Sequence, residues 1–219
     1  MGNLRIVCLS DTHNAHDGLQ VPDGDILVHA GDFTGRGHWS EVESFGKFMA
    51  RQPHREKVVI AGNHDFMFER DLAGALALLG DVTYLQDTGV TIAGLEFWGS
   101  PWQPEYHDWA FNLPRGAEIR KKWDLVPEET DVLVTHGPPE GVMDELYSFG
   151  AIGCEELAAA RKRIRPRLHI FGHVHEGYGT QVDDGILSVN AASCNLWYRP
   201  VNPPLVVDWD GKEFRSVSD

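Results

Sequence analysis

Short apolar runs alternate along the chain with polar residues of a few types. The runs are four to seven residues long and contain mainly Val, Ile and Leu, a composition that predicts strands buried on both faces. Five of them end in residues that can bind a metal or move a proton: LRIVCLS before Asp11 and His13, DILVHA before Asp32, KVVIA before Asn63 and His64, VLVT before His136, and LHIF before His173 and His175.

Helical patterns lie between several of these runs. Ser40 and Glu43 have the spacing of a capping box, and apolar residues follow at helical spacing over 42–49. Strands alternating with helices predict an α/β fold with at least part of its sheet parallel. Further helices are expected at 69–79, 117–124 and 154–164, and turn-linked strands at 82–98, 178–190 and 204–209.

The polar strand ends predict one shared site. Ligands gather beyond the carboxyl ends of strands in open α/β sheets, and all five runs place their polar residues there. Asp11 and His13 are two positions apart, so in an extended chain they face one side with their Cα atoms about 6–7 Å apart, and His173 and His175 repeat this spacing. Two Asp, one Asn and four His are too many ligands for one ion and suit two divalent ions about 3.5–4 Å apart that share a carboxylate.

The order of these motifs carries a family resemblance. DTH at 11–13, GD at 31–32, GNHD at 62–65, the lone His136 and GHVH at 172–175 resemble the calcineurin-like metallophosphoesterase superfamily, over roughly residues 4–192. GDFTGRG, GSPWQP, DWAFN, THGPP and FGHVHEGYG are most similar to its MPPED-type branch of small phosphodiesterases. The resemblance implies one domain over 1–219, with a layered fold: a central β-sandwich of mixed sheets flanked by helices, and the metal site at the strand C-terminal ends.

The resemblance also implies residue roles. Asp11, His13 and His175 would hold the first metal, Asn63, His136 and His173 the second, and Asp32 would bridge them with a hydroxide that attacks phosphorus in line. His64 would be the general acid for the leaving group, oriented by a carboxylate, for which Asp65 is the adjacent candidate. His64 and Asp32 are therefore the expected catalytic residues.

Two further residues are assigned to substrate binding. The second motif lacks the last Asp of the common GDxxD pattern, which leaves the support of His64 open, but Arg36 follows it as in the GDxxDRG of protein phosphatases, whose Arg contacts phosphate. The alternative for Arg36 is a solvated loop residue. Asn63 is neutral, so two divalent ions, two aspartates and a hydroxide leave a net charge of about +1 that attracts phosphate.

Composition narrows the partners and the metal. The formal charge of -14, without a basic run, argues against binding of large nucleic acids and favours a small phosphodiester or nucleotide substrate. No apolar run is long enough to span a membrane, and three widely spaced cysteines build neither a disulfide framework nor a CxxC zinc site, so we expect a cytoplasmic protein without membrane contact. Oxygen and imidazole ligands without thiolate predict manganese, with iron, zinc, cobalt or nickel as alternatives.

Other conspicuous residues are expected to be structural. Six histidines lie outside the motifs: His16, His29, His38, His54, His107 and His169. The cluster Trp98, Trp102, Tyr106, Trp109 and Phe111 is expected to form a satellite core or an interface, with a lip that stacks a nucleobase or aryl leaving group as the alternative. Asn195 and Trp197 are expected to finish a strand, although their backbone could line the site.

The predicted activity is a dinuclear metal-dependent phosphodiesterase. A phosphomonoesterase, including a protein phosphatase, is the second enzymatic possibility. A nucleotide-binding scaffold with little turnover is the alternative of a different class, although GNHD and GHVH are both complete. The sequence leaves the physiological substrate and the oligomeric state open.

Overall fold

Two six-stranded sheets form the centre of the computed structural model, which describes residues 3–217. In the first sheet the strand order is β16-β15-β1-β2-β3-β4. Its strands are β1 (Leu4–Leu9), β2 (Ile26–His29), β3 (Glu56–Val59), β4 (Thr83–Tyr84), β15 (Leu205–Trp209) and β16 (Phe214–Val217). Strands β1 to β4 run parallel, whereas β15 and β16 pair antiparallel at one side, so the sheet is mixed.

The second sheet has the order β13-β14-β12-β9-β6-β5. Its strands are β5 (Thr88–Ile92), β6 (Leu95–Ser100), β9 (Val132–Thr135), β12 (Leu168–Phe171), β13 (Gly179–Asp183) and β14 (Ile186–Asn190). The four central strands are parallel and the two outer strands are antiparallel to their neighbours. Two short pairs stand apart: β7 (Gln103–Pro104) with β8 (Asn112–Leu113), and β10 (Glu145–Leu146) with β11 (Gly150–Ala151).

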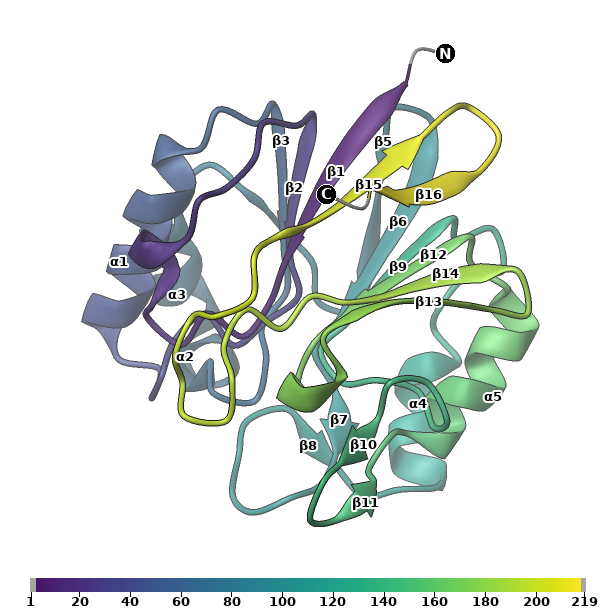
Figure 1. Ribbon diagram of the computed structural model, residues 1–219. Coiled ribbons are helices and arrows are strands. Elements are labelled where there is room, and N and C mark those ends of the chain that lie inside the picture. The colour runs from purple at the N-terminus through teal and green to yellow at the C-terminus, as the bar shows by residue number, and fades with distance from the viewer. Residues whose placement is uncertain (1–2, 218–219) are drawn as a thin grey trace.

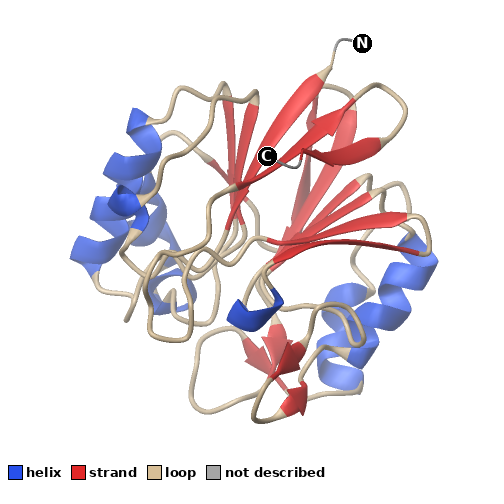
Figure 2. Cartoon of the chain, viewed as in Figure 1, coloured by secondary structure: helices blue, strands red, loops and turns tan. Residues whose placement is uncertain are grey.

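Helices flank both sheets (Figures 1 and 2). On the side of the first sheet lie α1 (Trp39–Arg51), α2 (Phe66–Arg70) and α3 (Leu72–Leu79); on the side of the second lie α4 (Ala117–Trp123) and α5 (Glu155–Ile164). Between the sheets, Ile6 and Val28 of the first share one buried core with Val134 and Ile170 of the second. The predicted β-sandwich of mixed sheets with flanking helices is confirmed, because each sheet buries apolar residues on both of its faces.

Two local predictions about helices were wrong. Helix α1 begins at Trp39, and the backbone N–H of His38 donates to Glu41 Oε2 at 2.8 Å, so Glu41 caps the helix and Ser40 already lies inside its first turn. The stretch 69–79 is divided at Asp71, whose Oδ1 accepts a hydrogen bond from the Gly74 N–H at 3.0 Å. A carboxylate that caps the second helix ends the first one there. Strand β16 was not predicted.

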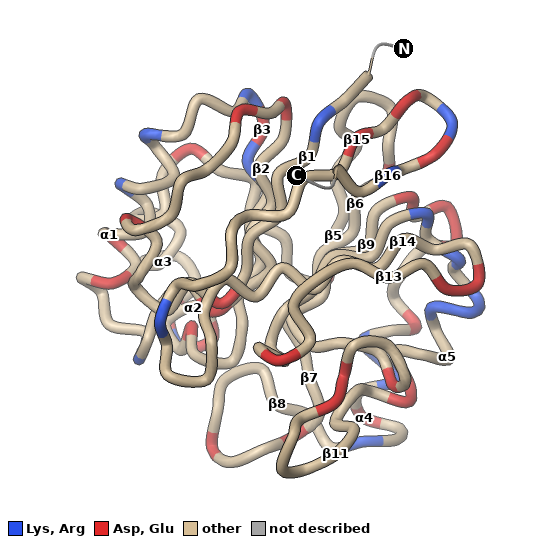
Figure 3. Tube along the Cα trace, in the orientation of Figure 1, with Lys and Arg blue, Asp and Glu red and all other residues tan. Residues whose placement is uncertain are grey.

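The charged residues and the cysteines are distributed as the sequence suggested, without a basic stripe and without a disulfide among the described residues. Figure 3 shows Lys and Arg positions scattered over the trace rather than gathered in a continuous basic stripe. Cys8, Cys154 and Cys194 are all buried and unpaired. Within residues 3–217, every helix is too short or too polar to cross a membrane.

Candidate active site

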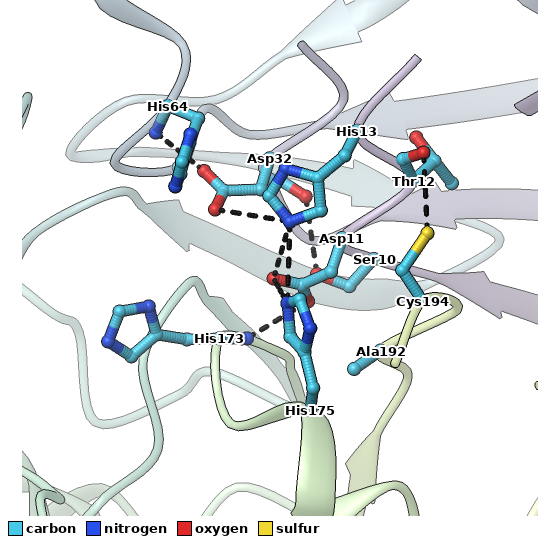
Figure 4. A network of polar contacts seen from close by, with 12 residues as sticks. Ser10, Asp11, Thr12, His13, Asp32, His64, His173, His175, Ala192 and Cys194 are labelled. Atoms are coloured by element: carbon cyan, nitrogen blue, oxygen red, sulfur yellow. Dashed lines mark hydrogen bonds and ion pairs between the residues drawn. The ribbon is translucent and has the colours of Figure 1, made fainter. Parts of the chain in front are cut away.

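The five strand ends meet at one place, where loops from both sheets come together. Figure 4 shows the residues that follow β1, β2, β3 and β12. Asp11 and His13 follow β1, Asp32 follows β2, and Asn63 and His64 follow β3 of the first sheet. His136 follows β9, and His173 and His175 follow β12 of the second sheet. The topology explains the convergence, because these five strands are parallel within their sheets and the sheets share one core.

The first group of candidate ligands consists of Asp11, His13 and His175. Nε2 of His175 lies 3.3 Å from Nε2 of His13 and 3.4 Å from Oδ1 of Asp11. This Asp11 oxygen is buried and accepts no hydrogen bond within the described part of the chain. A carboxylate oxygen and two imidazole nitrogens that face one another in a buried place are a donor set that fits a divalent cation.

The second group forms around His136. Its Nε2 lies 2.8 Å from Asn63 Oδ1 and 3.4 Å from Asp32 Oδ2, and its ring centroid is 5.0 Å from that of His173. The same Asp32 oxygen lies 3.8 Å from His13 Nε2, so this carboxylate stands between the two groups. The structure thus brings together all seven residues that the sequence assigned to metal binding, and the Asp32 carboxylate lies between the two groups of candidate ligands.

Backbone carbonyls orient the imidazoles. Nδ1 of His136 lies 2.9 Å from the Ala30 oxygen, Nδ1 of His175 lies 3.0 Å from the Asn195 oxygen, and Nδ1 of His64 lies 2.8 Å from the Gly35 oxygen. Each Nδ1 therefore carries a proton, and Nε2 is left for a metal or a substrate. Asn195 lies in a loop, so the prediction that it finishes a strand was wrong, and the alternative of a site-lining backbone holds.

The prediction that Asp65 orients His64 was wrong. Asp65 is fully buried, and its Oδ1 accepts from N–H and Oγ1 of Thr34 at 3.0 and 2.8 Å, while its Oδ2 accepts from N–H of Asp32 and of Gly62, both at 2.8 Å. Adjacent residues diverge at the end of a strand, so this carboxylate points away from the His64 ring. Asp65 ties the loop that carries Asp32 to the loop that carries Asn63.

The buried charges shift one another's pKa values. Burial opposes the charge on His136, but the Asp32 carboxylate outweighs it and raises the pKa of His136 to about 9. Burial likewise opposes ionisation of Asp32, yet His136 and His64 hold the pKa of Asp32 well below its ordinary value. Burial lowers the pKa of His13 to about 4 and that of His173 to about 3. Without metal, His136 is therefore protonated at neutral pH, whereas His13 and His173 are neutral.

Two buried histidines outside the motifs support the ligand loops. Nε2 of His29 lies 3.0 Å from the hydroxyl of Thr12, between Asp11 and His13. Nε2 of His169 lies 2.9 Å from the hydroxyl of Thr135, beside His136. Both histidines are fully buried, in agreement with the structural role expected for them.

A cavity of about 290 Å³ opens above the ligands, lined by His13, Asp32, Asn63, His64, His173 and His175 and by loop residues beyond them. Arg36 is exposed and lies outside the lining, so its contact with substrate stays a prediction. Among the described residues of the lining, Arg115 alone carries a Lys or Arg charge. Arg115 was not predicted, because no motif or periodic pattern marks it in the sequence.

The aromatic cluster divides between core and cavity. Phe111 is buried, and Trp98 and Trp102 are partly buried against the core, as expected. Tyr106 and Trp109 line the cavity instead, and the expectation of a purely structural cluster was wrong for them. Tyr198 was missed altogether: its ring lies 4.6 Å from that of His13, and its φ of 56° is a conformation that non-glycine residues rarely adopt outside functional loops.

Known proteins resemble this chain over nearly its whole length. Residues 4–177 match the family described as calcineurin-like phosphoesterase. The human protein named metallophosphoesterase domain-containing protein 1 is 44% identical over 232 residues, covering 94% of this chain and 71% of the relative. Two solved structures share the fold at low identity: TT1561 of Thermus thermophilus (TM-score 0.61, 13% identity, 98% of each chain covered) and an archaeal phosphodiesterase (TM-score 0.51, 18% identity, 98% of this chain and 99% of the other).

Proposed function

The chain belongs to the calcineurin-like phosphoesterase family, and we propose that it is a phosphodiesterase that works with two divalent metal ions. One ion would be held by Asp11, His13 and His175, the other by Asn63, His136 and His173, with Asp32 between them. When bound, the ions supply the Lewis acidity that activates water and neutralises charge on the phosphate. We propose manganese, because the donors are oxygen and imidazole nitrogen without thiolate.

The residues of the chain provide the remaining chemistry. His64 lines the cavity, and its Nδ1 proton is engaged by the Gly35 carbonyl oxygen. A proton on Nε2 is therefore the one that His64 can give to a departing ester oxygen. The backbone N–H of His64 donates to Asp32 Oδ1 at 2.7 Å, which fixes the proton donor relative to the bridging carboxylate.

The lining of the cavity favours a diester over a monoester. A monoester dianion carries one more charge than a diester and is usually bound by additional Arg or Lys side chains. Arg115 is the one such side chain among the described lining residues, and Glu105 and Glu176 lie in the same lining. Nη1 and Nη2 of Arg115 donate to the carbonyl oxygens of Gly153 and Ile152 at 2.7 and 2.8 Å. This shortage of free positive charge carries the proposal.

The test is metal analysis combined with kinetics on a matched pair of substrates. Bis(4-nitrophenyl) phosphate and 4-nitrophenyl phosphate share a leaving group and differ in the second ester. We expect about two metal ions per chain and a higher kcat/KM for the diester. A monoester rate well above the diester rate would favour the phosphomonoesterase alternative. Two bound metals without turnover of either substrate would favour the scaffold.

We further propose a cytoplasmic location, which the three unpaired, buried cysteines support because a reducing compartment keeps thiols free. A small phosphodiester or nucleotide is the proposed substrate, and the scattered Lys and Arg positions in Figure 3 support the absence of a large nucleic-acid partner.

A further inference from the structure

The surroundings of His64 define where a leaving group must lie. A general acid contacts the departing oxygen, so the group attached to that oxygen lies beside the acid. The ring of His64 has Trp109 at a centroid distance of 5.1 Å and Tyr198 at 6.1 Å. Both aromatic rings belong to the lining of the cavity. The leaving group therefore departs into an aromatic environment.

The position of Trp109 is fixed relative to the ligand loop. The N–H of Ala110, the next residue, donates to the carbonyl oxygen of Asn63 at 3.1 Å. The carbonyl oxygen of Ala110 in turn accepts from Nε2 of Gln103, a buried side chain, at 2.7 Å. These two hydrogen bonds fix the backbone next to Trp109 before any ligand arrives, which reduces the entropy cost of binding against the indole.

Further apolar side chains extend this surface. Tyr106 lies 5.4 Å from Trp109 between ring centroids, and Leu146, Phe149 and Ile152 of the segment around β10 and β11 also line the cavity. Phe149 is 75% exposed although it borders the cavity. Large apolar side chains exposed around one opening indicate a binding site rather than ordinary surface.

The charges of the lining disfavour an anionic leaving group. Glu105 and Glu176 repel further negative charge, and the two terminal nitrogens of Arg115 are already engaged by backbone carbonyls. A cavity of about 290 Å³ is also small, at the lower end of the range for ligand pockets. An uncharged group that is flat and apolar fits both the charge and the shape.

We propose that the leaving group of the substrate carries an uncharged planar ring that packs against Trp109, which makes Trp109 a specificity-determining residue. This inference rests on the proposed phosphodiesterase function. In the reaction the bond between phosphorus and the ring-bearing oxygen breaks, and that oxygen takes the proton from His64 Nε2. The oxygen of water forms the new bond to phosphorus and loses one proton to solvent, and His64 regains a proton from solvent. The ring departs as an alcohol or phenol.

The experiment compares two methyl diesters on the manganese-loaded protein. Methyl phenyl phosphate and methyl hexafluoroisopropyl phosphate release acids of similar strength, but only the first carries a planar ring. We expect the unchanged protein to prefer the phenyl ester by about tenfold in kcat/KM, the factor that a ring contact supplies. Trp109→Ala and Trp109→Leu should both reduce this preference to roughly one to twofold, whereas Trp109→Phe should keep most of it.

Trp197 supplies the matched control, because it is a 75% exposed tryptophan that lies outside the lining of the cavity. Trp197→Ala should leave the preference unchanged. If Trp109→Ala lowers both rates equally, the indole only supports His64 and the inference is wrong. If Trp109→Leu keeps the preference, the wall selects apolar rather than planar groups, and the inference is again wrong. Hydrolysis of both esters without preference overturns the inference alone; hydrolysis of neither overturns the proposed function with it.

Discussion

The first sheet supplies both carboxylates of the site, whereas the second sheet supplies imidazoles only. Asp11 and Asp32 follow β1 and β2, and both have a positive φ, 52° and 57°. His136 and His173 follow β9 and β12, and His173 alone of these two has a positive φ, 67°. Positive φ thus occurs on both sides, whereas the negative charge lies on one side only. The first sheet therefore sets the charge of the site, and the second contributes candidate ligands that are neutral or positively charged.

The two sides also differ in how they are held. Glycine at 31 permits the turn before Asp32, because its φ of 98° is unfavourable for other residues. Asp65 then ties this loop to its neighbour through the four hydrogen bonds that its carboxylate accepts. On the second side, His136 is held through a carbonyl oxygen of the first sheet, that of Ala30. The loops of the first sheet are thus held together by their own buried carboxylate, Asp65, which we call the anchor. The second side is held in part through a contact with the first.

The largest effect is expected at the shared carboxylate. Asp32→Asn removes the charge that lies between the two candidate ligand groups, 3.8 Å from His13 Nε2 and 3.4 Å from His136 Nε2. We expect kcat/KM to fall about 10³-fold or more, with less than the full metal content in elemental analysis. His173→Asn on the second side should cost less, because it removes a neutral ligand. Equal losses of kcat/KM in the two variants would contradict the different roles of the two sheets in the site.

Loss of the Asp65 carboxylate should reduce the free energy of unfolding more than loss of another buried carboxylate. Asp65→Asn places an amide NH₂ against N–H donors, since both oxygens of Asp65 accept hydrogen bonds. We expect a loss of about 3 kcal/mol in the free energy of unfolding, measured with urea in the presence of a chelator.

Asp144 supplies the control for that measurement. It is also buried, but its side chain accepts hydrogen bonds from the N–H groups of Gly141 and Gly153, at 3.1 Å each, through the same Oδ2. An asparagine can offer its carbonyl oxygen at that place, so Asp144→Asn should cost less than about 1 kcal/mol. Similar losses for both variants would show that Asp65 is not a special anchor.

Metal binding should release a proton from the second side. The carboxylate of Asp32 raises the pKa of His136 to about 9, so without metal His136 is protonated at pH 7.5. A metal ligand must be neutral, and loading should therefore release about one proton or more per chain at pH 7.5, and fewer at pH 10. Titrating manganese into weakly buffered protein with a pH indicator measures this. The same release at both pH values would contradict the assignment of His136.

The pH dependence of the metal-free protein follows from the same shift. A raised pKa of a histidine contributes stability that is fully present below its ordinary value and is lost as the pH rises through about 9. Urea unfolding with a chelator should therefore show the free energy of unfolding falling as the pH rises from the ordinary pKa of a histidine, 6.5, to about 9. His136→Gln should remove the part of this decrease that comes from His136.

The smallest effects are expected from the two threonine supports. Thr12→Val removes the hydroxyl that contacts His29, and Thr135→Val removes the one that contacts His169 and donates to the Gly137 oxygen at 2.7 Å. Each substitution should reduce the affinity for the manganese ion on its own side by about three- to tenfold. Electron spin resonance of manganese can follow this change during titration. Equal weakening of both ions by either variant would show that the two sides are not separately supported.

The sequence predicts the strands and the residues that gather at their ends better than it predicts what supports those residues. Five apolar runs ending in Asp, Asn or His locate the strands and the candidate ligands, because strand ends are encoded by side chains. The partner of His64 is a backbone carbonyl, that of Gly35, and no side-chain pattern records it. Trp109 and Tyr198 lie in loops without periodicity, so their place beside His64 and His13 depends on tertiary contacts. The capping error at Ser40 has a similar origin, since Glu41 competes for the same backbone groups.

Anomalous diffraction from crystals of the manganese-loaded protein would locate the ions. We expect two manganese peaks about 3.5–4 Å apart, one against Asp11, His13 and His175 and one against Asn63, His136 and His173, with Asp32 touching both and His64 touching neither. A single peak, or a peak bound by the His64 ring, which lies close to His13 and Asp32, would contradict this expectation.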